Sequence, residues 1–285
     1  MDAPEAADCL NCGGTLAGPY CSRCGQKALE TDPTLREFLH ETTAELTDWD
    51  GKIPSTLATL FLKPGALTVD FLAGRRARWL TPLRLYLLCS LAFFLSKPLG
   101  EAIGNRPHDD GVARIDIMSA DGKTVRPDVL EDLDSGIVGR VFGRERLVRA
   151  ALNNDQLNRE IDAVLPKAMF ILLPVFALLT MLAWRRQLPH YPAHLYLALH
   201  LHAAWFGAFA VTSIAAALFR SAAIAGTIDA AGIVYAGGYG LLAVRNIFRE
   251  SWPRTLAKGA AVTVAYGVCL IVAIIGLLAY AVTRM

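Results

Sequence analysis

Charged residues are scarce in this sequence. Lys, Arg, Asp and Glu make up 19% of its 285 residues, whereas 54% are hydrophobic. A soluble domain of this length has too little interior to bury that much apolar side chain. The charges also nearly cancel, because 28 Lys and Arg against 26 Asp and Glu leave a formal net charge of +2. So small a net charge does not predict a nucleic-acid partner.

The sequence also lacks several signals of secretion and catalysis. Its first ten residues, MDAPEAADCL, are acidic and contain neither a basic segment nor an apolar core, so no secretory signal peptide is predicted. We therefore expect one of the membrane helices to direct insertion. The sequence has no phosphate-binding loop, no nucleophile elbow and no His-Glu-x-x-His motif of zinc proteases. These absences favour a protein that is not an enzyme.

The sequence is rich instead in apolar runs after residue 80, which are long enough to cross about 30 Å of hydrocarbon as helices. They predict an all-α integral membrane protein with about five transmembrane helices. The expected spans are residues 80–95, 165–184, 193–219, 222–244 and 259–282. A polar stretch at about 98–164 is expected to form an extramembrane loop, whose rear half, residues 128–164, has the spacing of a helix that could continue into the second span. Asp229 lies inside the fourth expected span, where a re-entrant turn is the alternative.

The chain before the first span is predicted to contain a small metal-binding tail and amphipathic cytoplasmic helices. One helix is expected from about Pro33 to Trp49, and a shorter one from about Ser55 to Phe61. The first has an acidic face that would pair with a basic segment; its residues are Glu37, Glu41 and Glu45. The expected regions are a zinc-ribbon tail (1–28), cytoplasmic and juxtamembrane helices (29–79) and a transmembrane region (80–285).

Basic residues cluster before the first expected span, after the second, and between the fourth and fifth. With five spans, all three clusters fall on one side of the membrane, which the positive-inside rule assigns to the cytoplasm. We therefore expect a cytoplasmic N-terminus and an external C-terminus. The first cluster, whose predicted roles are topology and contact with lipid headgroups, consists of Arg75, Arg76, Arg78 and Arg84.

Four of the six cysteines form two copies of the motif C-x-x-C-G near the N-terminus: Cys9, Cys12, Cys21 and Cys24. The two-residue spacer lets both sulfurs of a pair face one ion, and the following glycine permits a tight turn whose backbone N–H groups point at the thiolates. Two such pairs predict a closed, structural Zn2+ site, because no coordination position remains for water or substrate. A unit this small would need the metal in order to fold.

Iron or another soft metal, disulfides and thiol redox chemistry are the alternatives for these four cysteines. A cytoplasmic location disfavours stable disulfides. A redox C-x-x-C motif normally opens a helix in a βαβ setting, and the sequence around this motif does not predict one. A zinc site is therefore the preferred interpretation of the four cysteines. Cys89 and Cys269 each lie alone in an apolar span, where an inert packing cysteine is expected.

Four ionisable residues within the expected spans form a candidate intramembrane polar site: His194, His200, His202 and Asp229. Such groups at membrane depth suggest a metal site or a proton relay. However, at about 100° per residue, His200 and His202 project roughly 160° apart on one helix. A joint site would need ligands from other spans, so hydrogen bonding between helices is the preferred interpretation.

Several short motifs occur together along the chain: Cys24-Gly25-Gln26, Thr56-Leu57, Lys63-Pro64-Gly65, the run FLAGRRARWLTP from Phe71 to Pro82, and His194-Leu195-x-x-Ala198-Leu199-His200. This combination resembles a bacterial membrane family known as domain of unknown function 3667. In similar proteins a Glu often precedes the first of these histidines, whereas Ala193 stands there in this chain. The resemblance implies a zinc-ribbon tail on a multi-pass protein of the bacterial inner membrane, with no established activity.

The preferred functional hypothesis is a membrane scaffold or accessory protein whose zinc ribbon docks a protein partner or a second copy of the chain. A small-solute or proton-coupled transporter is the first alternative, and an intramembrane enzyme is the second. No internal repeat of the kind that builds many transporters is visible, and an enzyme needs a convergent catalytic set that the spacing does not supply. A transporter would bring the polar side chains to one cavity, whereas a scaffold would pair them locally.

Overall fold

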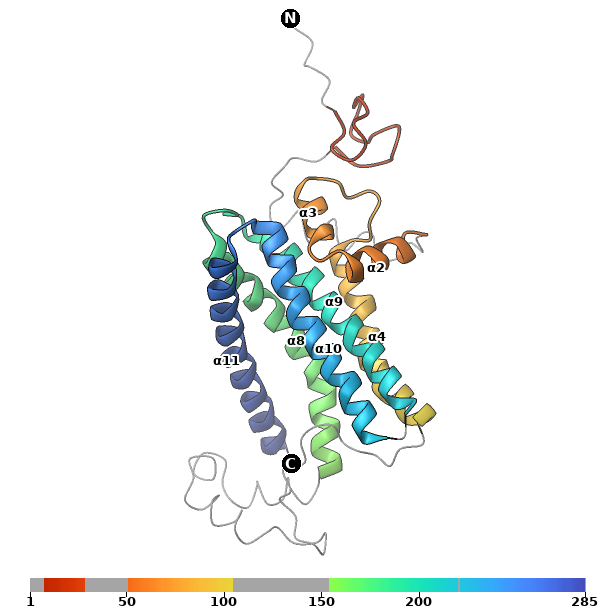
Figure 1. The fold of residues 1–285 in the computed structure, drawn as a ribbon, viewed down its shortest axis with the longest axis vertical. Helices are drawn as coiled ribbons and strands as arrows, with labels where there is room; N and C mark the ends of the chain where they lie inside the picture. The colour runs from red at the N-terminus through yellow and green to blue at the C-terminus, as the bar shows by residue number, and fades with distance from the viewer. Residues whose placement is uncertain (1–7, 29–50, 105–153, 220, 285) are drawn as a thin grey trace, which may run out of the picture. The chain divides into compact units, whose positions relative to one another are not determined.

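The computed structural model describes residues 8–28, 51–104, 154–219 and 221–284. Within these ranges every element longer than a single β-bridge is an α-helix (Figure 1). The helices are α2 (Ile53–Leu62), α3 (Ala66–Leu72), α4 (Pro82–Gly104), α8 (Asn154–Trp184), α9 (Tyr191–Ala217), α10 (Ala222–Phe248) and α11 (Trp252–Arg284). The short helix predicted around Ser55 to Phe61 is confirmed as α2. The acidic helix predicted at 33–49 lies outside the described residues.

Four helices in the described part of the chain are long and apolar enough to cross a membrane. They are Pro82–Gly100, Tyr191–Ala217, Ala223–Phe248 and Trp252–Leu277. These helices confirm the predicted all-α membrane protein. The remaining expected span, the second along the chain, lies in α8, where Ala168–Trp184 is an apolar helical segment.

Some helix boundaries differ from the predicted spans. Helix α4 continues through Pro98 to Gly104, into the stretch that was predicted as loop. Helix α8 begins at Asn154, in agreement with the helical spacing of the rear half of that stretch. Helix α11 begins at Trp252 rather than near residue 259. These differences arise because hydropathy marks only the part of a helix that suits hydrocarbon, whereas backbone hydrogen bonds continue beyond it. Helix α10 is continuous through Asp229, so the alternative of a re-entrant turn was wrong.

The chain divides into two compact units. One contains residues 1–107 and 173–263, and the other contains residues 108–172 and 264–285. The cysteine motifs, α2, α3, α9 and α10 all belong to the first unit. The features described below lie in that unit.

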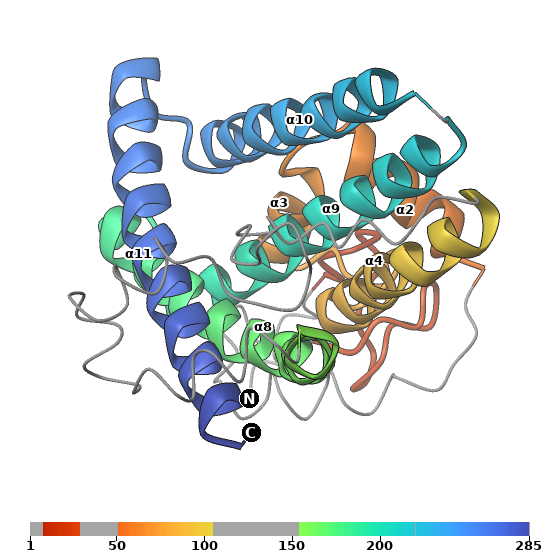
Figure 2. The same cartoon turned by 90° about the horizontal axis from the view of Figure 1, so that it is seen from below.

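Helix α9 is the central element of the first unit. It lies between α4 and α10, and it packs against both of them (Figure 2). Its sequence is rich in alanine, which allows neighbouring helices to approach closely. Of its apolar stretch 61% is buried, against 11% for the corresponding stretch of α11. This contrast means that α9 is covered by other helices, whereas most of the apolar stretch of α11 is exposed among the described residues.

Helices α2 and α3 form a short helical hairpin that is fixed to α9 and α10. The Tyr235 hydroxyl donates to the carbonyl oxygen of Phe61 at 2.8 Å, and the Asn246 amide donates to that of Pro64 at 2.9 Å. Gly207 leaves the space that the Phe61 ring occupies, since a Cβ there would collide with the ring. The turn between the two helices needs Gly65, whose φ is +81° and whose Cα faces the α10 backbone.

Candidate metal centre and its docking turn

The two cysteine motifs fold into two similar turns, which we call the knuckle (residues 8–28). In the first, the Cys9 N–H donates to the Gly14 carbonyl at 2.8 Å; in the second, the Cys21 N–H donates to the Gln26 carbonyl at 2.8 Å. The glycine after each second cysteine has a positive φ of 68° (Gly13) or 73° (Gly25). L-residues with a side chain rarely adopt that conformation, which explains the C-x-x-C-G pattern in both copies.

The knuckle brings all four cysteine sulfurs together, within 4.8 Å of one another. The Sγ atoms of Cys9 and Cys24 are 3.6 Å apart, as are those of Cys12 and Cys21. Four sulfurs at about 2.3 Å from a tetrahedral metal would be separated by about 3.8 Å, so this arrangement fits such an ion. Among the described residues, no other group of three or more His, Cys, Asp or Glu side chains is close enough to share a metal.

Backbone N–H groups favour thiolates in the second turn of the knuckle. The Gln26 backbone N–H, followed by the Asn11 side chain, lowers the pKa of Cys24 to about 6. The backbone N–H groups of Cys24 and Arg23 lower the pKa of Cys21. The Gly14 backbone also favours the Cys12 thiolate, but burial and the three neighbouring sulfurs raise its pKa to about 12. The backbone of the knuckle therefore favours the thiolate forms of Cys21 and Cys24, which are the forms that bind a metal ion.

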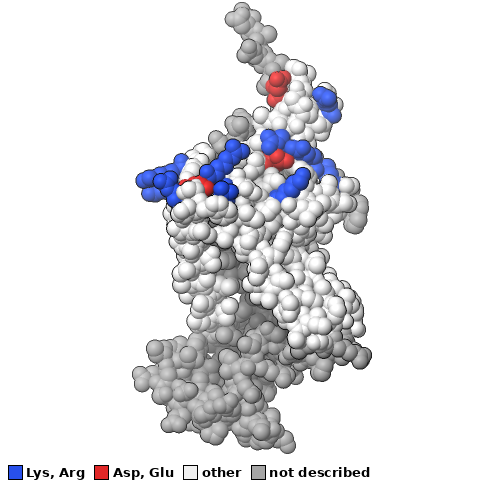
Figure 3. All heavy atoms as spheres, in the orientation of Figure 1, with Lys and Arg blue, Asp and Glu red and all other residues white. Residues whose placement is uncertain are grey.

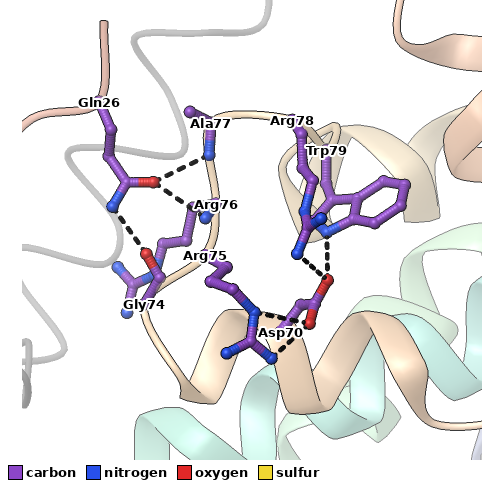
Figure 4. A network of polar contacts seen from close by, with 8 residues as sticks. All are labelled: Gln26, Asp70, Gly74, Arg75, Arg76, Ala77, Arg78 and Trp79. Carbon is purple, nitrogen blue, oxygen red and sulfur yellow. Dashed lines mark hydrogen bonds and ion pairs between the residues drawn. The ribbon is translucent and has the colours of Figure 1, made fainter. Parts of the chain in front are cut away.

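Gln26 joins the knuckle to the chain at the entrance of α4. Its side-chain amide donates to the carbonyl oxygen of Gly74 at 2.7 Å, and its Oε1 accepts from the backbone N–H groups of Arg76 and Ala77 at 3.0 Å each (Figure 4). We call residues 74–77 the docking turn. The Gln26 side chain is buried, so these three bonds are shielded from water. All hydrogen-bonding atoms of this side-chain amide except one N–H therefore face the docking turn.

Gly74 allows the close approach of the knuckle to the docking turn. Its φ is +75°, and an added Cβ would lie 2.5 Å from Cδ1 of Leu10. A side chain at this position would be strained and would also push Leu10 away. Leu10 stands between Cys9 and Cys12, so the first turn of the knuckle also contacts the docking turn.

Asp70, in α3, holds the docking turn and the residues that follow it. Its Oδ1 accepts from Arg75 at 2.6 and 3.0 Å, and its Oδ2 accepts from Arg78 at 3.0 Å and from the Trp79 indole at 2.8 Å (Figure 4). Burial opposes ionisation of Asp70, but these hydrogen bonds and the two positive charges keep its pKa below the usual value. Both oxygens are therefore committed to the chain's own cations.

The predicted basic cluster is consequently engaged within the protein. Arg75 and Arg78 bind Asp70, while Arg76 donates to the Phe71 carbonyl at 3.4 Å and lies 5.3 Å from the centre of the Tyr196 ring. Arg84 is half-buried in the first turn of α4. Contact of these arginines with lipid headgroups stays a prediction.

A comparison with known families identifies part of this region. Residues 50–94 match the family described as Protein of unknown function (DUF3667). The resemblance that the sequence motifs suggested is thereby confirmed. The DUF3667 segment contains α2, α3, the docking turn and the first part of α4. No curated protein and no solved structure matches the chain.

The three histidines of α9, which lies outside the DUF3667 segment, have separate surroundings. His194 lies 3.2 Å from the Thr180 hydroxyl and donates to the Leu188 carbonyl at 2.9 Å. His200 lies 3.0 Å from the hydroxyl of Thr68 in α3, and His202 donates to the Ala198 carbonyl of its own helix at 2.8 Å.

The candidate intramembrane site is therefore not assembled from a shared set of partners. The three rings also have different aromatic neighbours: Phe248 for His194, Phe71 for His200, and Phe176 with Trp205 for His202. Asp229 is exposed on α10. A metal or proton-relay role for these four residues stays a prediction.

Glu250, between α10 and α11, is the centre of a second polar cluster. It accepts hydrogen bonds from the Trp184 indole at 3.1 Å, from the Gln187 side chain, and from Lys258 at 2.7 Å. The Lys258 hydrogen bond is the main reason why the pKa of Glu250 is lowered, although burial opposes this. The cluster connects the end of α8 to the beginning of α11.

The sequence analysis assigned no structural role to Gln26, Asp70 or Glu250. A signal was present for the first two. Gln26 directly follows the second C-x-x-C-G motif, and Asp70 is the only acidic residue between Gly51 and Gly100, a segment that also contains seven Lys and Arg. No comparable signal marked Glu250, because its partner Trp184 is 66 residues away in the chain.

Proposed function

We propose that this chain is a non-enzymatic scaffold or accessory protein of a membrane, in which a Zn2+ ion folds the knuckle and the folded knuckle is fixed to the entrance of the first span. The observation that carries the proposal is the double role of Gln26. Its backbone closes the turn that contains Cys21 and Cys24, and its side chain holds the docking turn. Metal binding and docking therefore share one residue.

The metal would act by ordering the knuckle. A segment of this size buries too little apolar surface to fold through a core, so metal ligation would supply the free energy of folding. Ordering Cys21 to Gln26 then places the Gln26 amide against Gly74, Arg76 and Ala77. With all four sulfurs bound, the ion has no open position for a substrate. This supports a structural role for the metal rather than a catalytic one.

The distribution of Lys and Arg side chains supports an orientation of the chain in the membrane. Lys and Arg side chains gather in one band across the upper part of the face shown in Figure 3, and the described surface below that band shows no charged side chain. The positive-inside rule assigns such a band to the cytoplasm. We therefore place the N-terminus in the cytoplasm and the chain in a bacterial inner membrane, where the exposed side of the knuckle would meet a protein partner or a second copy of the chain.

Metal analysis of the purified full chain tests the structural Zn2+. The variant carries Cys21→Ser and Cys24→Ser, and the matched control carries Cys269→Ser, which removes a thiol from α11 only. We expect one equivalent of zinc in the wild type and the control, and nearly none in the double variant. Equal zinc in all three proteins would refute the metal assignment, and iron in place of zinc would correct it.

Affinity purification of the same three proteins tests the scaffold role. Proteins that are captured with the wild type and with Cys269→Ser should be absent from the double variant, because the surface that binds them depends on the folded knuckle. If the captured partners stay the same while zinc is lost, the knuckle is not their docking site.

A further inference from the structure

A groove of about 260 Å³ opens between the α2–α3 turn and the end of α10. The residues that line it are Lys63, Pro64, Ala66, Val69, Asp70 and Asn246. At about 30 Å³ for each water, this volume would hold roughly nine waters, which is enough for a phosphate group with a short polyol. The groove belongs entirely to the first unit, and none of the four cysteines lines it.

The walls of the groove are held in place without a ligand. The Asn246 amide donates to the Pro64 carbonyl across the groove at 2.9 Å, and the Tyr235 hydroxyl fixes the end of α2 at the Phe61 carbonyl. Gly65 lies directly against the α10 backbone. The groove is therefore preformed, which lowers the entropic cost of binding a ligand.

The charges of the groove favour an anion, because the one acidic lining residue, Asp70, is already paired with arginines while Lys63 also lines the groove. Lys63 is exposed, and no partner for its ammonium group is found among the described residues. Asp70 is the one acidic residue in the lining, and both of its oxygens are already bound by the guanidinium groups of Arg75 and Arg78. Among the described residues the Lys63 charge therefore has no counter-ion, whereas a ligand ammonium would have to displace two arginines to reach Asp70.

The apolar part of the groove points to a ligand with a hydrocarbon portion. Pro64, Ala66 and Val69 contribute apolar wall, and Leu62, one residue before Lys63, is 77% exposed. An apolar side chain this exposed at the end of a membrane helix bundle is suited to lipid rather than water. The Lys63 ammonium and the apolar wall are therefore neighbours. This arrangement suits a ligand that has both an anionic group and a hydrocarbon portion.

We propose that this groove binds the headgroup of an anionic phospholipid, with the Lys63 ammonium against the phosphodiester and the glycerol against Pro64, Ala66 and Val69. The acyl chains would leave past Leu62 along the apolar surface of the bundle. This site differs from the arginine cluster predicted from the sequence, because the guanidinium groups of Arg75 and Arg78 are bound by Asp70.

Native mass spectrometry of the full chain in detergent, with added phosphatidylglycerol, tests the proposal with three variants. Lys63→Gln removes the charge, Ala66→Leu fills the groove and keeps the charge, and Arg254→Gln removes an exposed cation of α11 that does not line the groove. We expect Lys63→Gln to weaken phosphatidylglycerol binding about fivefold and Ala66→Leu to weaken it at least as much. Arg254→Gln should bind like the wild type, and phosphatidylcholine should bind more weakly than phosphatidylglycerol.

Three results would overturn the proposal. Equal weakening by Lys63→Gln and Arg254→Gln would mean that only the general positive charge attracts the lipid. Unchanged binding by Ala66→Leu would exclude the groove as the site; if that variant does not fold, Val69→Phe fills the same groove from α3. Displacement of phosphatidylglycerol by excess inorganic phosphate would show a site for free anions rather than for a lipid.

Discussion

Asp70 and Glu250 are centres of two polar clusters that use the same chemistry at different distances along the chain. Each carboxylate accepts hydrogen bonds from a tryptophan indole and from at least one cation. The partners of Asp70 all lie within nine residues of it. Glu250 reaches partners 63 and 66 residues away. The Asp70 cluster therefore shapes one local segment, whereas the Glu250 cluster holds separate helices together.

The two clusters also differ in what they connect. The segment shaped by Asp70 begins at the docking turn, so it carries the knuckle through Gln26. Glu250 has no such link among the described residues and instead fastens the α8 end to α11. We infer that a substitution of Asp70 should weaken the docking of the knuckle, whereas a substitution of Glu250 should weaken the packing of α8 against α11.

Asp70→Asn should have the largest effect. The new amide N–H group would face the donors of Arg78 and Trp79, and the two arginines would lose their counter-charge. Loss of charged hydrogen bonds in this half-buried setting should lower the free energy of unfolding by about 2 kcal/mol. Thermal unfolding in detergent measures this, and trypsin should cleave the chain faster at Arg75 to Arg78.

Asp229→Asn is the matched control for that measurement, because Asp229 is exposed on α10. It should unfold at the same temperature as the wild type. An equal loss of stability in both variants would show that the hydrogen bonds and ion pairs of Asp70 do not cause the effect.

Gln26→Ala should have the next largest effect, and it should be confined to docking. One buried and two partly buried hydrogen bonds disappear, and the Gly74 carbonyl and two backbone N–H groups lose their partner, which should weaken docking by roughly 1–2 kcal/mol. Trypsin cleavage of the docking turn should accelerate while bound zinc is unchanged. Ser22→Ala, an exposed position of the knuckle, is the control; if it accelerates cleavage equally, Gln26 is not the docking residue.

Glu250→Gln should have a smaller effect, about 1 kcal/mol on the free energy of unfolding, because one ion pair is lost rather than two. Trypsin cleavage of the docking turn should stay at the wild-type rate, since Glu250 is not part of the Asp70 cluster. Faster cleavage there in Glu250→Gln would contradict the separation of the two clusters.

The smallest expected effect is the change with pH in the stability difference between wild type and Asp70→Asn. Because folding lowers the pKa of Asp70, its stabilisation is fully present above the ordinary aspartate pKa of about 3.9 and is lost as pH falls through the lower, folded value. The unfolding temperatures of wild type and Asp70→Asn should therefore differ at pH 7 and converge in acid. A difference that persists at pH 2 would show that the aspartate charge is not its cause.

The separation of partners along the chain decides which parts of the structure the sequence could predict. The cluster of four cysteines, helix α2 and four of the expected membrane spans follow from local spacing and hydrophobicity, and the described residues contain them. The extent of α4 and α11 was not predictable in the same way, because each helix continues beyond its apolar stretch. The pairing of Gln26 with the docking turn was also missed, since it joins residues about 50 positions apart.

By itself, the sequence determined the features that depend on near neighbours. The C-x-x-C-G repeats need glycine at a positive φ, and long apolar runs must form helices, because backbone groups in hydrocarbon can be satisfied only internally. Only the tertiary structure decided which polar group meets which. It places Gln26 on the docking turn, separates the partners of His194, His200 and His202, and brings Trp184 to Glu250. Those pairings depend on how distant segments pack, and no local pattern encodes that.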